Sequence, residues 1–159
     1  MQDFVHLHVH TQYSLLDGQA SVARLVDKAM KNGMKGIAVT DHGNMFGIKE
    51  FTNYVNKKNS GPKGEVKDLK KRIAGIEAGT IECEDKEAEI ADCKAKIVEA
   101  ESKLFKPIIG CEMYVARRTM DLREGKLDQS GYHLIVLAKN EKGYHNLIKL
   151  VSHAWTRGY

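Results

Sequence analysis

The stretch FVHLHVHT, residues 4–11, decides how this chain is interpreted, because three histidines alternate in it with aliphatic residues. A β-strand points successive side chains to opposite faces, so His6, His8 and His10 are predicted to share one face of a short buried strand. Imidazole is a common metal ligand. A purification tag or a solvated edge is the alternative, but a tag is a consecutive run of histidines. The alternation therefore favours a metal or catalytic site.

The composition limits the class of protein. A chain of 159 residues is long enough for one domain with a core. No apolar run is long enough for a membrane span, and the first residues lack the basic-then-apolar pattern of a signal peptide. Cys83, Cys93 and Cys111 are odd in number and form no CxxC pair, which favours a reducing compartment. We therefore expect a cytoplasmic protein without membrane contact. Its net charge of +4 permits contact with nucleic acid without indicating it.

Helix and strand patterns alternate after the histidines. Ser21 is a good N-cap for an amphipathic helix, which Asn32-Gly33 is predicted to end. Residues 36–40, GIAVT, form an apolar run typical of a strand that is covered on both faces. Asp41-His42-Gly43-Asn44 follows this strand, and a second helix that includes Phe46 comes next. This order predicts a parallel α/β fold.

Residues 57–106 interrupt this order with a segment rich in lysine, glutamate, aspartate and alanine. Asn59-Ser60-Gly61-Pro62 is predicted to break the preceding helix, and Ala78-Gly79-Thr80 offers a turn between two charged helices. We predict an antiparallel helical hairpin; one long helix or a partly disordered arm is the alternative. Charges of both signs alternate, which favours a solvated face over a binding surface. The predicted apolar seam consists of Val66, Leu69, Ile73, Ile76, Ile90, Ile97, Ala100 and Leu104.

The α/β pattern resumes at residues 107–115, PIIGCEMYV, a predicted strand with Glu112 in its middle. Residues 117–131 are polar and contain glycine, so we expect a loop. Residues 132–138 form another apolar strand with His133 near its start, and Asn140 is predicted to cap a last helix.

Histidines and carboxylates fall on these predicted strands or just after them. Loops that follow parallel strands gather at one face of an α/β fold, so we expect these side chains to lie close together. Imidazoles mixed with carboxylates suit zinc, manganese or iron better than calcium or magnesium. More than four ligands exceed one tetrahedral site, which predicts two or three metal ions with Glu112 as the bridge. Such a cluster holds a phosphate ester and produces a hydroxide nucleophile. The set comprises His8, His10, Asp17, Asp41, His42, Glu112 and His133.

Each of these residues also has a purely structural interpretation. Asp17 suits a turn, Asp41 could cap the helix that follows it, and His133 could be an ordinary strand histidine. Glu112 could pair with one of the two arginines that follow its strand. His6, next to the start of the first strand, is expected to support the ligands rather than bind metal.

The motifs resemble those of the PHP (polymerase and histidinol phosphatase) family. HLHVHTQYSLLDG at residues 6–18 and AVTDHGNMFG at 38–47 resemble its opening motifs. With KPIIGCEMYV at 106–115 and the segment 133–159, the chain is similar, more narrowly, to the N-terminal PHP domains of bacterial replicative DNA polymerase alpha subunits. The resemblance implies a distorted seven-stranded α/β barrel related to the TIM barrel, with a three-metal site at the carboxyl ends of its strands.

The resemblance also implies roles for individual residues. Carried over by motif, the metal ligands are His8, His10, Asp17, His42, Glu112 and His133. Glu112 would bridge two ions, and Glu112 with Asp17 would act in catalysis. The implied cofactors are zinc, manganese or iron ions, up to three in the complete domain.

The implied function is that of a metal-dependent phosphoesterase within a DNA-directed DNA polymerase, in some members a 3′–5′ proofreading exonuclease. The alternative is a non-catalytic module that supports the polymerase body or docks a proofreading subunit. The implied partners are DNA, the remainder of the alpha subunit and other replicase subunits.

Two departures from the family pattern qualify this expectation. The family's barrel continues beyond this length, and its later cysteine, aspartate and histidine ligands are absent here. We therefore expect residues 1–159 to hold roughly the first half of the barrel and to have little or no activity alone. The segment 57–106 is the second departure, because the family joins helix to strand there by a short link. A free-standing histidinol-phosphatase-like enzyme fits the ending YHNLIKLVSHAWTRGY poorly.

Overall fold

The structure of this chain, a computed structural model, describes residues 4–158. It is a mixed α/β fold with a three-stranded sheet and five α-helices in that part of the chain. The residues divide into two compact units. The first contains the chain up to Tyr54 together with the chain from Lys106 onward, and the second contains Val55–Phe105.

The sheet of the first unit is partly antiparallel. Its strands β1 (Gly36–Val39), β2 (Lys106–Val115) and β3 (Tyr132–Leu137) lie in the order β1-β2-β3. β1 is parallel to β2, whereas β3 is antiparallel to β2. The prediction of a parallel α/β fold is therefore wrong for β3. A parallel partner needs a crossover that returns the chain to the same end, and the connection from β2 to β3 contains only the 3-10 helix Gly125–Leu127.

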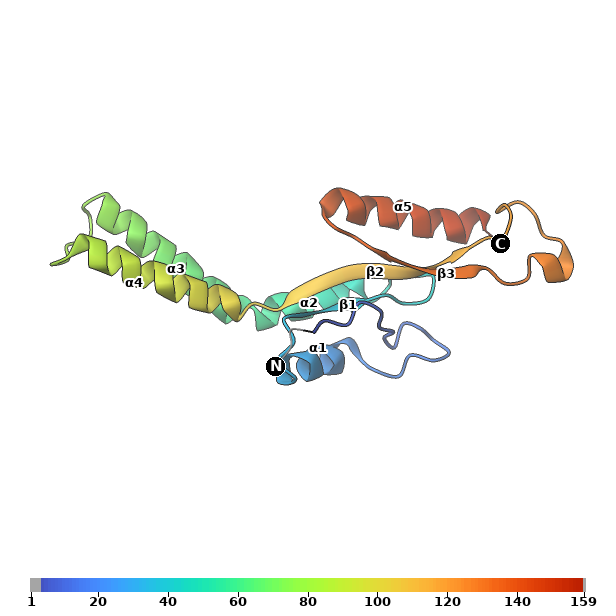
Figure 1. Cartoon of the computed structure of the whole chain (residues 1–159), viewed down its shortest axis with the longest axis horizontal. Coiled ribbons are helices and arrows are strands. Elements are labelled where there is room, and N and C mark those ends of the chain that lie inside the picture. The colour runs from blue at the N-terminus through green and yellow to red at the C-terminus, as the bar shows by residue number, and fades with distance from the viewer. Residues whose placement is uncertain (1–3, 159) are drawn as a thin grey trace. The chain divides into compact units, whose positions relative to one another are not determined.

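Helices α1 (Val22–Lys31) and α5 (Glu141–Arg157) lie on opposite sides of this sheet (Figure 1). Both begin at the predicted caps: the Ser21 side chain accepts a hydrogen bond from the backbone N–H of Arg24, and the Asn140 side chain accepts one from that of Gly143. The buried face of α1 consists of Val22, Val26 and Ala29. On the other side, Leu147 and Val151 of α5 form a core cluster with Cys111 of β2.

The histidine segment lies beside β1, but it bends at Leu7 and His8 and is not a regular strand, so that prediction is wrong in detail. The backbone N–H of Ala38 donates to the His6 carbonyl (2.8 Å), and that of Thr40 donates to the Val9 carbonyl (2.9 Å). The segment therefore advances three residues while β1 advances two, as in a β-bulge. The Thr40 side chain occupies the position of a ladder bond, because its Oγ1 accepts from the backbone N–H of Val9 (2.9 Å).

In the second unit, α3 (Ser60–Glu77) and α4 (Lys86–Ser102) pack against each other as an antiparallel hairpin (Figure 1). The break predicted at residues 59–62 is wrong, because only Asn59 separates α3 from α2 (Ile48–Lys58). Pro62 lies in the first turn of α3, where its missing N–H removes no intrahelical bond. Phe46 precedes α2 and is not part of it.

The turn of the hairpin is built as the sequence predicts. Gly79 has a φ of 72°, a conformation that glycine adopts without steric cost. The backbone N–H groups of Thr80 and Gly79 donate to the carbonyls of Gly75 (2.9 Å) and Ile76 (3.1 Å), the paired bonds of a Schellman motif. All predicted seam residues are buried or half-buried, and Cys93, which the prediction left out, is buried among them.

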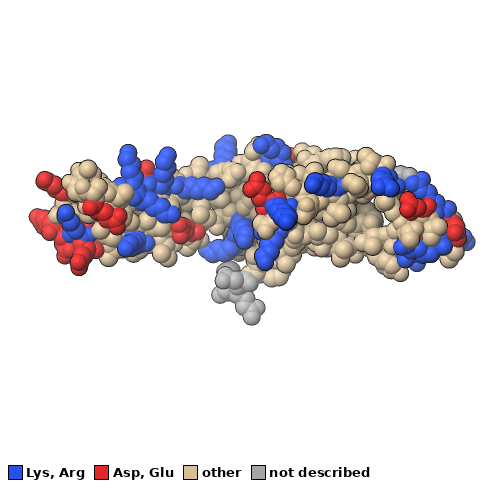
Figure 2. Space-filling view, turned by 90° about the horizontal axis from the view of Figure 1, so that it is seen from above, with Lys and Arg blue, Asp and Glu red and all other residues tan. Residues whose placement is uncertain are grey.

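Some charges of the hairpin form ion pairs with each other. The Arg72 guanidinium lies 2.7 Å from the Glu89 carboxylate, and the Lys70 ammonium lies 3.6 Å from that of Glu101. Acidic side chains gather at the turn end of the hairpin, and lysines and arginines lie along its length (Figure 2). Exposed pairs of this kind add little to stability, so the apolar seam is the larger stabilising term. Within residues 4–158, no helix is apolar and long enough to cross a bilayer.

We expect Asn59→Ala to lower the free energy of unfolding by about 1–3 kcal/mol. The buried Asn59 amide donates to the Phe105 carbonyl (2.8 Å) and accepts from the Phe105 N–H (2.9 Å), so alanine leaves both backbone groups without a partner. Urea unfolding followed by circular dichroism measures the change. Asn53→Ala, at an exposed position of α2, is the matched control. Equal midpoints for the two variants would show that the Asn59 bridge contributes nothing.

Candidate metal centre

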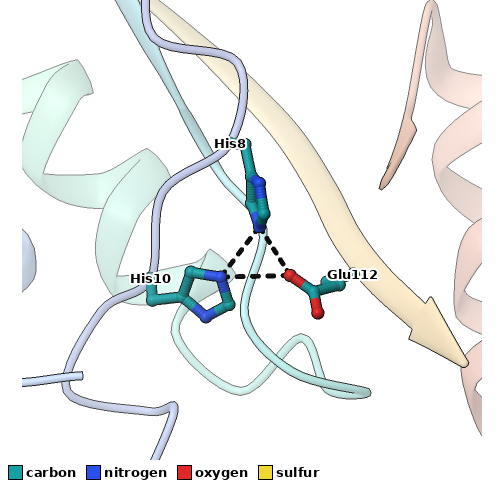
Figure 3. A group of neighbouring side chains, drawn as sticks. All are labelled: His8, His10 and Glu112. Atoms are coloured by element: carbon teal, nitrogen blue, oxygen red, sulfur yellow. Dashed lines mark hydrogen bonds and ion pairs between the residues drawn. The ribbon is translucent and has the colours of Figure 1, made fainter. Parts of the chain in front are cut away.

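The carboxylate of Glu112 on β2 lies at the centre of a group of imidazoles. It is 1% exposed, and each of its oxygens faces two histidines. Oε2 lies 2.5 Å from Nε2 of His8 and 3.1 Å from Nε2 of His10. Oε1 lies 2.5 Å from Nδ1 of His133 and 3.2 Å from Nδ1 of His42. Figure 3 shows the nitrogens of His8 and His10 turned toward each other and toward Glu112.

Sheet topology explains why residues far apart in sequence meet here. His42 follows β1 and forms an isolated parallel bridge with Glu112. The antiparallel direction of β3 places its first residues beside the end of β2, so that His133 lies opposite Tyr114. In a parallel strand His133 would lie at the far end of the sheet. The reversal of β3, which the sequence did not predict, therefore brings the predicted residue to the site.

Asp17 reaches the group through a tight loop. Its carboxylate lies 2.9 Å from Nε2 of His42, whose other ring nitrogen faces Glu112. Gly18 lies so close to the Thr11 carbonyl that a Cβ would come within 1.7 Å of its oxygen, so only glycine fits. All the predicted ligands thus lie at one place: His8, His10, Asp17, His42, Glu112 and His133.

Two predicted alternatives are wrong. Asp41 neither caps α2 nor faces the imidazoles, because its buried carboxylate accepts three hydrogen bonds from Thr11 and Ser14. Glu112 does not pair with an arginine, because Arg117 binds Ser130 and Arg118 binds Asp128.

His6 was expected to support the ligands, but within residues 4–158 its ring contact is with Phe4. The ring of His6 packs edge-on against Phe4, with centroids 4.7 Å apart, and its side chain is exposed. Tyr114, which no sequence pattern singled out, contacts the group instead. Its hydroxyl lies 2.9 Å from Nδ1 of His42, and its ring packs edge-on against His133 at 4.8 Å.

The charges of the site support one another. Burial alone would raise the pKa of Glu112, but the hydrogen bond to His8 and the positive charge that the other imidazoles carry when protonated lower it overall. The hydrogen bond from His42 lowers the pKa of Asp17. Burial raises the pKa of the Cys111 thiol to about 11, so this neighbour of Glu112 stays a neutral core side chain.

The donor set fits a metal ion. Oε1 of Glu112 is, within residues 4–158, the one buried side-chain nitrogen or oxygen without a hydrogen bond, because the nearby ring nitrogens do not approach it at hydrogen-bonding angles. Two overlapping groups bring ligand atoms within 4.8 Å of one another: His8 with His10 and Glu112, and His10 with Asp17 and His42. In the first group the atoms are 2.5–3.1 Å apart. In a tetrahedral zinc site with bonds of ~2.0–2.1 Å, neighbouring ligand atoms lie ~3.3 Å apart, so these separations are ~0.2–0.8 Å shorter than those around a bound zinc ion.

Comparison with known proteins identifies relatives. The model of the PHP domain family matches residues 6–159. The chain is 38% identical over 157 residues to the DNA polymerase III subunit alpha of Borreliella burgdorferi and 39% identical over 156 residues to that of Treponema pallidum. It is 32% identical over 164 residues to that of Aquifex aeolicus. These alignments cover 98–99% of this chain, which spans about a tenth of the length of the curated relatives it matches.

We expect Glu112→Gln to flatten the dependence of stability on pH. A carboxylate whose pKa is lowered on folding stabilises the fold above its unfolded pKa, and this stabilisation is lost as the pH falls through the lower folded value. Urea unfolding at several values from about pH 6 to about pH 3 measures the dependence. The wild type should lose more stability over this range than Glu112→Gln. The exposed Glu84→Gln variant is the control and should follow the wild type. Parallel curves for wild type and Glu112→Gln would contradict the coupling.

Proposed function

This chain belongs to the PHP domain family, and on that basis we propose that its histidine and carboxylate group is a divalent metal centre for phosphodiester hydrolysis. The observation that carries the proposal is the buried Glu112 carboxylate, with an oxygen that lacks a hydrogen bond and four imidazoles around it. A buried anion is costly unless cations or hydrogen bonds compensate it, and metal ions would do so here.

The proposed ligands divide between the two oxygens of Glu112. His8 and His10 face Oε2, and His42 and His133 face Oε1, so Glu112 would be the carboxylate that the two sets of ligands share. Asp17 would complete the His42 side. Zinc, manganese or iron suits this mixture of nitrogen and oxygen ligands. Ions bound there would supply a hydroxide at neutral pH and neutralise phosphate oxygens.

Burial separates the roles of the two predicted catalytic carboxylates. Glu112 is 1% exposed and is surrounded by imidazoles, so it holds ligands in place rather than exchanging protons with solvent. The Asp17 side chain is 58% exposed, and the hydrogen bond from His42 lowers its pKa, so it is ionised at neutral pH and suited to binding a metal ion rather than to accepting a proton. The half-exposed Tyr114 carries a hydroxyl beside His42 that can donate to a phosphate oxygen of a substrate.

The proposed substrate is the 3′ end of DNA. The relatives are DNA polymerase III alpha subunits, and a hydrolytic metal centre on such a protein is suited to 3′–5′ proofreading. We propose that the chain acts as part of such a replicative polymerase in the cytoplasm, with DNA, the rest of the alpha subunit and other replicase subunits as partners. We further propose that its three strands belong to a seven-stranded barrel, into which residues 57–106 are inserted.

A second function, structural support of the polymerase body, is favoured by the positions in the sequence of the segments that the same contacts join. The contacts with Glu112 join the histidine segment, the end of β1 and β3 to β2 without any contribution from substrate. In that case a metal ion would act as a crosslink between these segments. Its loss would lower thermal stability, and the protein would not degrade the 3′ ends of DNA primers whether or not the metal is bound.

Metal binding tests the shared part of both functions. We expect the purified chain to bind Zn²⁺ or Mn²⁺ in isothermal titration calorimetry. His10→Ala should weaken binding at least ~10-fold, because His10 belongs to both ligand groups. His145→Ala, which removes an exposed imidazole of α5, is the control and should bind like the wild type. Absence of binding by the wild type would contradict the proposal.

Degradation of 3′-labelled DNA separates the two functions. The assay uses a polymerase of the relatives' length that contains this chain, because we expect these 159 residues alone to have little or no activity. Under the enzymatic proposal, His8→Ala abolishes metal-dependent release of the label while His145→Ala does not. If the wild type, loaded with metal, leaves primer ends intact and His8→Ala only lowers the melting temperature, the structural function is correct.

A further inference from the structure

A buried network of hydrogen bonds lies directly behind His10. Thr11, Ser14 and Asp41 are each no more than 2% exposed. One oxygen of the Asp41 carboxylate accepts from the backbone N–H of Thr11 (2.6 Å) and from the Ser14 hydroxyl (2.7 Å). The other accepts from the Thr11 hydroxyl (2.8 Å). Every neighbour of the carboxylate in this network is therefore a donor.

The single proton of the Ser14 hydroxyl determines which ring nitrogen of His10 is protonated. A hydroxyl has one hydrogen to donate, and here it is directed to the Asp41 carboxylate. The Ser14 oxygen must then accept from its other neighbours, the backbone N–H of His42 (3.2 Å) and Nδ1 of His10 (3.1 Å). Nδ1 of a neutral His10 consequently carries the ring proton, and Nε2 presents a lone pair.

The lone pair of His10 points to the proposed metal centre. Nε2 of His10 faces His8 and Glu112, whereas Nδ1 lies on the opposite side of the ring (Figure 3). His8 is different, because its contacts in the structure involve Nε2 and its side chain is 51% exposed. Of these two neighbouring imidazoles, only His10 has its tautomer set by a buried hydroxyl.

We propose that Asp41 and Ser14 are positioning residues that fix His10 in the Nδ1-protonated tautomer and so prepare Nε2 to bind metal. The tautomer follows from the hydrogen bonds alone, whereas its benefit for metal binding rests on the proposed function. Residues behind a ligand that fix its tautomer typically contribute 10–100-fold to metal affinity. The arrangement also explains why an aspartate so close to the site faces away from it.

Nitrogen-15 NMR of the histidine side chains tests the tautomer in the metal-free chain. At alkaline pH, where ordinary imidazoles are neutral, long-range proton–nitrogen spectra distinguish a protonated Nδ1 from a protonated Nε2. We expect wild-type His10 to be protonated at Nδ1, and Ser14→Ala to shift it toward the Nε2-protonated form while His8 is unchanged. Thr40→Val is the matched control, since this equally buried hydroxyl binds the Val9 backbone and does not contact His10. It should leave the His10 signals in place.

Two results would overturn the inference: a wild-type His10 protonated at Nε2, or Ser14→Ala signals identical to those of the wild type. Zinc titration of the same proteins gives the second readout, in which Ser14→Ala should bind ~10–100-fold more weakly than Thr40→Val. Equal affinities would refute the role in metal binding. If no variant binds zinc but the tautomer shifts as expected, the proposed function fails and the positioning of His10 stands. If zinc binds and the tautomer does not shift, only the inference fails.

Discussion

The structure of the site depends on one buried charge. The Glu112 carboxylate is almost fully excluded from water, and four imidazoles from three separate segments approach its two oxygens. Burial of an uncompensated carboxylate would favour its neutral form, yet its pKa is lowered, because the histidines outweigh the cost of desolvation. The same charge therefore holds the histidine segment and the ends of the strands together and presents converging nitrogen and oxygen atoms that suit a metal ion.

The direction of β3 follows from the connection that precedes it and completes this arrangement. The connection over residues 116–131 contains no crossover helix and returns the chain beside the end of β2 that it has just left, so the first residues of β3 lie near Glu112. His133 reaches the carboxylate only because of this reversal. The sheet therefore has a parallel pair, β1 and β2, and an antiparallel edge strand, β3, which carries His133 to the site.

The sequence predicted the composition of the site better than its geometry. Caps, apolar runs and the turn at Gly79 depend on local stereochemistry, so the starts of α1 and α5, the apolar run of β1 and the turn of the hairpin followed directly. The bulge beside β1 and the direction of β3 depend on pairing between distant segments, which periodicity does not contain. Asp41 was ambiguous for the same reason, because a cap, a ligand and a buried acceptor share one residue type and differ only in their neighbours.

The position of Asp41 shows how a site of this kind gains precision from a loop. Residues on loops are usually less well fixed than residues on strands, yet the loop that carries His10 and Asp17 is fastened at both ends. Asp41 binds Thr11 and Ser14, and the close approach of Gly18 to the Thr11 carbonyl tightens the turn between them. These bonds lie in a water-excluded interior, where hydrogen bonds to a carboxylate are strong. Asp41, next to β1, thereby holds the loop that carries His10 and Asp17, while Glu112 on β2 faces the imidazoles directly.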